Sequence, residues 1–391
     1  MSAGGDISDS IANSFATRLI RWQREHGRHH LPWQNTRDAY SIWLSEIMLQ
    51  QTQVGTVIPY YRRFLQCFPD IQSLASAPLD EVMVQWSGLG YYSRARNLHK
   101  AAQRIVGEHG GIFPEEIDII RQLPGIGRST AAAIAVFAFG KRAAILDGNV
   151  KRILSRCFGI EGYPGEKQVE AQLWQKAEAL LPKGDESPIE RDIEDYTQAL
   201  MDLGATICTR ARPMCGSCPL RLECVAFRDS RAGSLPTPRP RKILPEREAV
   251  LLLAVAQGKI LLEKRPSTGI WGALWSLPEM GMNENVIEYC LRFGINVRPM
   301  SQMEALTHTF THFRLRIYPL ILQVISRPPD HLTPEVLSQP RRPCVWRVPE
   351  DALKAAIPSP VRKVLLQYAS QTEPLEIPAM PDNCPGIYSK E

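Results

Sequence analysis

The sequence contains no long hydrophobic run. No stretch approaches the roughly 20 consecutive apolar residues that a membrane-spanning helix needs. The first ten residues, MSAGGDISDS, also lack the basic and apolar regions of a secretory signal. These absences favour a cytoplasmic protein. In a bacterium this would mean the cytosol and the nucleoid. The net charge of +5 is small, and it permits a polyanionic partner without requiring one.

Disulfide bonds are not expected either. The nine cysteines are an odd number, and thiols stay reduced in the cytoplasm, so the composition argues against a disulfide framework. Four of the nine lie between residues 208 and 224. This clustering predicts that these four cysteines share one role.

The N-terminal part has the pattern of an all-α domain. Apolar residues recur at spacings of three and four across residues 11–227, for example at Ile42, Trp43 and Ile47, which predicts helices. Asp38 stands where it can cap the helix that carries Trp43. The chain has 391 residues, so a prior of about 150 residues per domain predicts two or three domains.

The pattern changes after this part of the chain. Residues 228–247 are rich in proline and arginine and have few large apolar side chains, which predicts an extended linker. Residues 248–370 then predict an α+β domain, with a hairpin over 249–263 and a closing helix over 350–368. Residues 371–391 are polar and proline-rich, and we expect a disordered tail.

The clustered cysteines have the spacing of a ligand loop. Cys208, Cys215, Cys218 and Cys224 form the pattern C-x6-C-x2-C-x5-C. Thiolates select soft centres such as iron–sulfur clusters, zinc or Cu(I), and four of them in one loop can hold one cubane cluster. Zinc is the main competitor, but zinc sites usually pair two C-x2-4-C knuckles and only one is present here. Four unrelated free thiols are improbable at this density.

A glycine turn precedes a very apolar helix. The string LPGIGRSTA occupies residues 123–131, and its glycines permit a tight turn with backbone N–H groups exposed at the start of a helix. A dinucleotide-binding fingerprint would need a strand before the turn, whereas residues 117–122 have a helical pattern. The turn therefore predicts an anion-binding site of another kind.

Glu46 is a candidate proton donor. Hydrolysis of an N-glycosidic bond needs a proton donor for the leaving base and a carboxylate that stabilises the sugar cation. The helical neighbours of Glu46 are Ile42, Trp43 and Leu49, and burial among them would raise its pKa and keep it protonated near neutrality. The alternative is an ordinary solvated helix glutamate, which is the commoner case.

Asp147 is the candidate second carboxylate. It lies in ILDGNV at 145–150, a short turn that leads into a helix. On the sequence alone an ordinary N-cap is the favoured interpretation, because aspartate is among the preferred N-cap residues.

Several stretches resemble the MutY family of adenine DNA glycosylases, in the superfamily of endonuclease III. The likeness spans nearly all of residues 15–230. It implies an all-α glycosylase fold with a helix–hairpin–helix at about 115–140 and a [4Fe–4S] cluster on the loop 208–224. A smaller α+β Nudix-like domain would follow. The stretches that carry it are residues 31–62, GLGYYSRARNLHKAA at 88–102, ILDGNVKR at 145–152 and MDLGATICTR at 201–210.

The resemblance also implies roles for single residues. Glu46 would be the general acid and base, and Asp147, with Asn149 beside it, would stabilise the oxocarbenium-like transition state. Gln51 and Tyr91 would probe and wedge the duplex while the adenine is flipped out. Three further residues would line the base pocket: Trp33, Gln50 and Gln198.

The helix–hairpin–helix separates this chain from its lyase relatives. Its turn, with Gly125 and Gly127, would grip the DNA backbone. In endonuclease III this motif carries a lysine that attacks the sugar as a nucleophile, and the matching position here is Ser129. Strand cleavage should therefore be weak or absent.

The C-terminal domain resembles the Nudix-like domain with which MutY recognises 8-oxoguanine. Within residues 307–313, THTFTHF, the triplet Phe310, Thr311 and His312 matches the F-S-H loop of the family, with threonine where serine is usual. Residues 274–295 contain no glutamate-rich helix that could hold Mg²⁺ around nucleotide phosphates. We therefore expect a binding module rather than a nucleotide hydrolase.

Together these features predict an enzyme of base-excision repair. It would release adenine mispaired with 8-oxoguanine or guanine from duplex DNA, as a monomer and without efficient strand cleavage. A bifunctional pyrimidine glycosylase/lyase is opposed by Ser129. A non-catalytic DNA-binding iron–sulfur protein is opposed by the presence of both Glu46 and Asp147. A nucleotide-pool hydrolase is opposed by the missing metal-binding helix.

Overall fold

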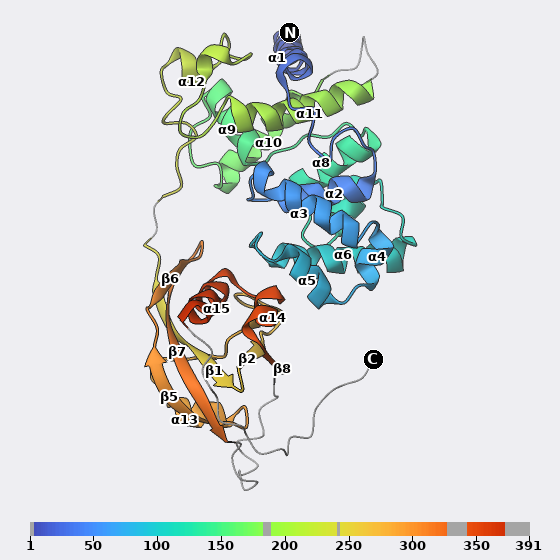
Figure 1. The fold of residues 1–391 in the computed structure, drawn as a ribbon. Coiled ribbons are helices and arrows are strands. Elements are labelled where there is room, and N and C mark those ends of the chain that lie inside the picture. The colour runs from blue at the N-terminus through green and yellow to red at the C-terminus, as the bar shows by residue number, and fades with distance from the viewer. Residues whose placement is uncertain (1–3, 183–188, 241–242, 327–341, 372–391) are drawn as a thin grey trace. The chain divides into compact units, whose positions relative to one another are not determined.

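The chain folds into two compact units (Figure 1). The first comprises Met1–Ala77 and Arg94–Arg241, and the second comprises Pro78–Ser93 and Lys242–Glu391. The tail predicted at 371–391 lies outside the described residues, apart from Gln371. The computed structural model describes residues 4–182, 189–240, 243–326 and 342–371.

The first unit is all-α, as predicted. Among its described residues there are helices and turns but no strand. Its helices are α1 (Gly4–His26), α2 (Ala39–Leu49), α3 (Val54–Cys67), α4 (Ile71–Ser76), α6 (Ser93–His109), α7 (Ile117–Gln122), α8 (Arg128–Phe139), α9 (Gly148–Phe158), α10 (Lys167–Ala179), α11 (Ile189–Thr206), η1 (Cys215–Ser217) and α12 (Val225–Arg228).

Helix α2 carries Glu46 and is fixed at its start by a side-chain cap. The carboxylate of Asp38 accepts hydrogen bonds from the backbone N–H groups of Tyr40 and Ser41, which confirms the predicted cap. Trp43 is fully buried, and most of the helix is buried with it. Glu46 is only half-buried, because it lines a pocket.

The helix–hairpin–helix is formed by α7 and α8, as predicted. Gly125, in the turn between them, has a φ of +81°, and a Cβ there would lie 2.8 Å from the Cβ of Asn97. Both observations require glycine. Gly127 is the N-cap of α8 and makes no side-chain cap hydrogen bond. No N-cap side chain therefore covers the backbone N–H groups in the first turn of this helix.

The main core of the helical unit lies around α8, α9 and α11. Helix α8 contributes small side chains such as Ala132 and Ala133, and these pack against larger ones such as Leu154 and Leu203. Small residues let helices approach closely. The close packing holds the starts of α8 and α9 in fixed positions.

The first part of the predicted linker packs on the helical unit instead of standing free. Leu235 is 3% exposed, and its carbonyl accepts a hydrogen bond from Arg156 Nε at 2.8 Å. Leu235 is one of the few large apolar residues in this stretch, and burying it stabilises the contact. The first unit therefore continues to Arg241.

The second unit contains a mixed sheet of α+β type. The long strands β1 and β7 pair in parallel, whereas the other strand pairs are antiparallel. The order is β3-β2-β1-β7-β5, with β4 paired to β1, β6 to β7 and β8 to β2. The strands are β1 (Glu246–Ala256), β2 (Lys259–Lys264), β3 (Trp275–Ser276), β4 (Glu279–Met280), β5 (Asn296–Gln302), β6 (Leu306–Thr309), β7 (Arg314–Ser326) and β8 (Cys344–Arg347).

Helices complete the second unit, and one prediction for them was wrong. The hairpin predicted over 249–263 is formed by β1 and β2, and α13 (Val286–Leu291) packs beside β5. The single closing helix predicted over 350–368 is instead two helices, α14 (Pro349–Lys354) and α15 (Ser359–Gln371). Pro358 precedes α15, and proline disfavours the helical conformation in the residue before it.

A short segment from the N-terminal part of the sequence belongs to the second unit. It contains α5 (Leu79–Trp86). The carboxylate of Asp80 pairs with the ammonium of Lys264 and accepts a hydrogen bond from Trp275 Nε1 at 3.3 Å. None of the helices that the structure describes is long and apolar enough to cross a membrane.

Candidate active site

One large pocket of the helical unit collects nine of the predicted site residues. It opens between the C-terminal end of α2, the starts of α8 and α9, and one face of α11. These elements come from distant parts of the sequence. The predicted residues that line the pocket are Trp33, Glu46, Gln50, Gln51, Gly127, Ser129, Asp147, Asn149 and Gln198.

Glu46 lies in this pocket with a perturbed pKa. Burial, together with the smaller effect of the negative charge of Asp147, raises the pKa of its carboxyl to about 8. Burial has this effect because it disfavours the charged form. Near neutral pH the side chain therefore holds a proton, and it can give that proton to a bound base.

Asp147 lines the same pocket and also caps α9. Its Oδ1 accepts a hydrogen bond from the backbone N–H of Val150 at 2.8 Å. Burial raises the pKa of Asp147, while the N–H groups at the start of α9 and the cations Arg152 and Lys151 oppose that rise. The helix start and the two cations favour the ionised form. The same carboxylate therefore caps helix α9 and lines the pocket.

Ser129 connects the start of α8 to the turn before α9, and Asn149 makes a contact within α9. Ser129 Oγ accepts a hydrogen bond from the backbone N–H of Leu146 at 2.9 Å, next to Asp147. Asn149 Oδ1 accepts one from Arg152 at 2.8 Å. These contacts fix the turn that carries Asp147, and Ser129 takes part in them as a neutral hydroxyl.

The end of α2 is held by an arginine that the sequence analysis missed. Arg94, on α6, is 7% exposed and donates hydrogen bonds from Nη1 to the carbonyls of Ile47, Met48 and Gln50 at 2.6–2.9 Å. Gln51 follows with a φ of +59°. The signal was present, since Arg94 lies within the stretch 88–102 that resembles the family, but only the fold reveals its partners.

Trp33 and Gln50 make further contacts at the pocket wall. Trp33 is 9% exposed and packs edge-to-face on Tyr61, with ring centroids 5.3 Å apart. Gln50 is the C-cap of α2, and its Nε2 donates to Thr130 Oγ1 at 3.4 Å. Both side chains line the pocket that also contains Glu46.

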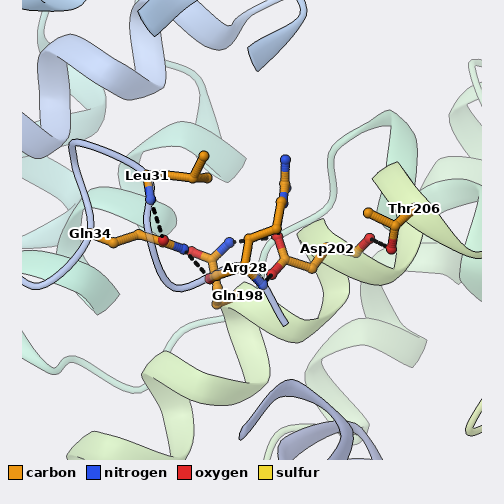
Figure 2. A network of polar contacts seen from close by, with 6 residues as sticks. All are labelled: Arg28, Leu31, Gln34, Gln198, Asp202 and Thr206. Carbon is orange, nitrogen blue, oxygen red and sulfur yellow. Dashed lines mark hydrogen bonds and ion pairs between the residues drawn. The ribbon is translucent and has the colours of Figure 1, made fainter. Parts of the chain in front are cut away.

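Gln198 belongs to a polar network that was also missed (Figure 2). Gln198 Nε2 donates to Asp202 Oδ1 at 2.9 Å, and Asp202 is fully buried. Arg28 donates to the same carboxylate from its backbone N–H at 2.8 Å and from Nε at 2.7 Å. The sequence separation of 174 residues hides this pair from pattern analysis.

Four predicted DNA-contact residues lie in the second unit. Tyr91 follows α5, has a φ of +48° and is 46% exposed. Phe310, Thr311 and His312 form the turn between β6 and β7, where the N–H of Phe310 donates to the carbonyl of Phe313 at 2.9 Å. The Phe310 ring stacks on Phe313, and both Thr311 and His312 are exposed. The turn presents a hydroxyl and an imidazole to solvent.

The four clustered cysteines line one small cavity between α9, the end of α11 and the loop that follows. Arg156 Nη1 lies 3.4 Å from Cys208 Sγ and donates to the carbonyl of Thr209 at 2.7 Å. Within the described ranges, no three His, Cys, Asp or Glu side chains form a group that could hold a metal ion. The cysteines that the structure describes form no disulfide.

The raised pKa of Glu46 predicts a pH-dependent cost to folding. An ordinary glutamate ionises near pH 4.5, whereas Glu46 in the folded chain ionises at about 8. Folding therefore takes up a proton within this window, and stability falls as the pH rises through it. We expect Glu46→Gln to raise the free energy of unfolding by about 1–3 kcal/mol at pH 7.

Chemical denaturation at several pH values checks this expectation. The stabilisation should be absent near pH 4 and grow up to about pH 8. Glu166→Gln, an exposed glutamate at the start of α10, serves as the matched control and should change stability little at any pH. A Glu46→Gln difference that is constant with pH would contradict the raised pKa.

The chain matches known repair proteins along most of its length. The sequence profile of the HhH-GPD superfamily of base excision DNA repair proteins matches residues 44–179, and that of the NUDIX domain matches residues 249–367. The adenine DNA glycosylase of Buchnera aphidicola subsp. Acyrthosiphon pisum is 36% identical over 354 residues, which are 90% of this chain and 97% of that protein. The adenine DNA glycosylase of Homo sapiens is 32% identical over 431 residues, 94% of this chain and 76% of that protein.

A solved structure resembles the helical unit. The structure of a thermostable thymine-DNA glycosylase superposes with a TM-score of 0.50 at 30% identity, and the match covers 56% of this chain and 98% of that one. The two profiles match in one chain order, a base excision repair domain followed by a NUDIX domain.

Proposed function

The chain belongs to the adenine DNA glycosylase family of base excision repair, and from that membership we propose that it hydrolyses the N-glycosidic bond of adenine mispaired with 8-oxoguanine or guanine in duplex DNA. The observation that carries the proposal is the pair of carboxyl groups in one pocket. Glu46 has a pKa raised to about 8, and Asp147 lies at the positive end of a helix. We further propose that the enzyme acts as a monomer in the cytoplasm.

The first step is a proton transfer to the leaving base. Glu46 gives its proton to a ring nitrogen of adenine, so that the C1′–N9 bond breaks with its electron pair on the base. The sugar is left as an oxocarbenium-like cation. The Asp147 carboxylate stabilises this cation by its charge. A water molecule then bonds to C1′ and gives a proton to the Glu46 carboxylate, which restores the enzyme.

We propose that the reaction ends at the abasic site. Strand cleavage by the lyase relatives needs an amine at the position of Ser129. Here the Ser129 hydroxyl accepts the N–H of Leu146, so it supports the turn of Asp147. A hydroxyl held in this way cannot form a Schiff base with the sugar, and the proposal is therefore a monofunctional enzyme.

We propose that the adenine is flipped out of the duplex, because a base that is stacked and paired in the duplex cannot reach the carboxyl of Glu46 inside the pocket. Gln51 and Tyr91 have backbone φ values of +59° and +48°, and such conformations are uncommon outside glycine and cluster at functional sites. The open N–H groups at the start of α8, after Gly127, suit a phosphate of the DNA backbone.

The exposed turn of the second unit is our candidate for reading the opposite base. Guanine presents N7 only as an acceptor, whereas 8-oxoguanine carries a proton there. The Thr311 hydroxyl can accept from that proton, and it is exposed beside His312. A threonine keeps the hydroxyl of the usual serine, so the same contact is available.

We expect the double variant Thr311→Ala/His312→Ala to lose part of its preference for 8-oxoguanine over guanine. The loss of one or two hydrogen bonds should lower that preference by roughly 3- to 10-fold. Single-turnover rates on A:8-oxoguanine and A:guanine duplexes measure the ratio. Thr307→Ala, an exposed threonine of β6, is the control. An unchanged ratio in the double variant would remove this turn from the recognition surface.

We also propose a [4Fe–4S] cluster on Cys208, Cys215, Cys218 and Cys224. Five thiols line the cavity, these four and that of Cys157 on α9, and no His, Asp or Glu side chain is among the lining residues. A cubane cluster bonds one thiolate to each of four irons, so four thiols need not converge on one ion. When bound, the cluster would hold the loop 208–224 against α9. Arg156, which touches Cys208 and two nearby carbonyls, already ties this loop to that helix.

The cluster proposal predicts about four irons per chain and visible thiolate-to-iron absorbance. Cys218→Ser should lose both, because it removes one ligand. Cys67→Ser, which changes an exposed cysteine of α3, should keep both. Metal analysis of protein purified without oxygen provides the measurement, and stoichiometric zinc in place of iron would contradict the proposal.

The substrate proposal is tested by comparing mispairs. Under single-turnover conditions the enzyme should release adenine fastest from A:8-oxoguanine, more slowly from A:guanine and hardly at all from A:T. A T:guanine duplex is included because the structural relative is a thymine-DNA glycosylase. Release of thymine in preference to adenine would overturn the proposed substrate.

A further inference from the structure

One end of the Gln198 amide is held by a neighbour that can only accept hydrogen bonds. Asp202, one helical turn further along α11, accepts from Gln198 Nε2 at 2.9 Å (Figure 2). An ionised carboxylate has no proton to donate, so the nitrogen of the amide must face it. The carbonyl oxygen of Gln198 is then the end that the side chain can offer to the pocket.

Asp202 itself cannot turn away from Gln198. Its side chain is fully buried, and its two oxygens accept from the backbone N–H and from the guanidinium of Arg28 at 2.6–2.8 Å. Arg28 is anchored in turn, because Gln34 Nε2 donates to its carbonyl at 2.8 Å and Gln34 Oε1 accepts from the N–H of Leu31 (Figure 2). The hydrogen bonds between the Arg28 guanidinium and the Asp202 carboxylate are charge-assisted, and such bonds are stronger than those between neutral groups.

An outward-facing carbonyl oxygen distinguishes purines by their substituent at position 6. Adenine has an amino group there, which donates, whereas guanine and hypoxanthine have an oxygen, which accepts. We infer that the Arg28–Asp202 pair is a specificity-determining device that holds the Gln198 oxygen toward the flipped base, so that the pocket selects a purine with a donor at position 6. The inference rests on the proposed function, and Asp202 acts as a positioning residue through Gln198.

Asp202→Asn tests the inference, because the asparagine can donate to Gln198 Oε1 and let the amide turn. Single-turnover rates are measured on duplexes that place adenine, hypoxanthine or unsubstituted purine opposite 8-oxoguanine. We expect the adenine-to-hypoxanthine rate ratio to fall by about 10-fold or more. The adenine-to-purine ratio should fall by roughly 3- to 10-fold, the value of one neutral hydrogen bond. A purely structural defect would slow all three bases alike.

Two further variants complete the design. Asp195→Asn breaks another aspartate–arginine pair between α11 and α1, since Asp195 Oδ2 lies 2.6 Å from Arg24 Nε, and it should leave both ratios unchanged. Gln198→Met removes the amide without disturbing the ion pair. It should lower both ratios, and adding Asp202→Asn to it should cause no further change.

The outcomes separate this inference from the proposed function. Wild-type ratios in a folded Asp202→Asn protein would overturn the inference. Wild-type ratios in Gln198→Met would also overturn it, and this second test remains available if Asp202→Asn does not fold. If the wild-type enzyme releases no base from any of these duplexes, the proposed function itself fails. Altered ratios in Asp202→Asn and Gln198→Met but not in Asp195→Asn support the inference.

Discussion

Glu46→Gln should reduce the rate of adenine release by about 10²–10⁴, the usual value of a general acid–base group. The amide keeps the size and hydrogen bonding of the carboxyl, but it cannot give a proton to the base or take one from water. In the mechanism proposed here Glu46 acts in both steps, so the loss should lie at the upper end of this range. Duplex affinity should remain, because it depends mainly on phosphate contacts.

The measurement compares single-turnover rates and duplex binding on the same A:8-oxoguanine substrate. Glu166→Gln is again the control and should match the wild type in both. The wild-type rate should also fall as the pH rises through about 8, where the carboxyl of Glu46 ionises, and this fall should be missing from the residual activity of Glu46→Gln. Near wild-type turnover by Glu46→Gln would mean that another group donates the proton.

Asp147→Asn should reduce the rate by about 10²–10³, as expected for the loss of one preorganised group that faces a developing charge. The variant also separates the two roles of this residue. Asparagine caps helices about as well as aspartate, so the cap on the N–H of Val150 is kept and stability should change little. Asp147→Ala loses the cap as well and should cost about a further 1 kcal/mol of stability.

Rates and thermal unfolding of the two Asp147 variants are measured side by side. The proposed mechanism expects both to be slow and only Asp147→Ala to unfold at a clearly lower temperature. If Asp147→Asn keeps nearly the wild-type rate, Asp147 is a helix cap and no more, which is the interpretation that the sequence alone favours.

The local parts of this account could be predicted from the sequence. The Asp38 cap, the helix of Glu46 and the turn of Asp147 depend on residues a few positions apart, and propensity and spacing describe such features well. The resemblance to a known family then brought Glu46, Asp147, Gln50 and Gln198 together. All four line one pocket, although their roles in the reaction stay predictions.

The long-range parts could not be predicted. The sequence has 46 basic residues (Lys and Arg) and 41 acidic residues (Asp and Glu), 87 in all. No local pattern singles out Arg28 and Asp202 among them as a pair. The same holds for Arg94, whose partners lie 44–47 residues away. The stretch predicted as one closing helix, 350–368, contains Pro358, and in the structure it divides into two helices, the first of which ends on the N-terminal side of this proline.

The most direct test of the central claim uses the wild-type chain and a duplex with a single A:8-oxoguanine pair. Free adenine and strand breaks are measured together, before and after treatment with alkali. We expect free adenine to appear in the same amount as the alkali-labile sites, with the strand intact until alkali is added. No release of adenine, or strands already broken without alkali, would contradict a monofunctional adenine glycosylase.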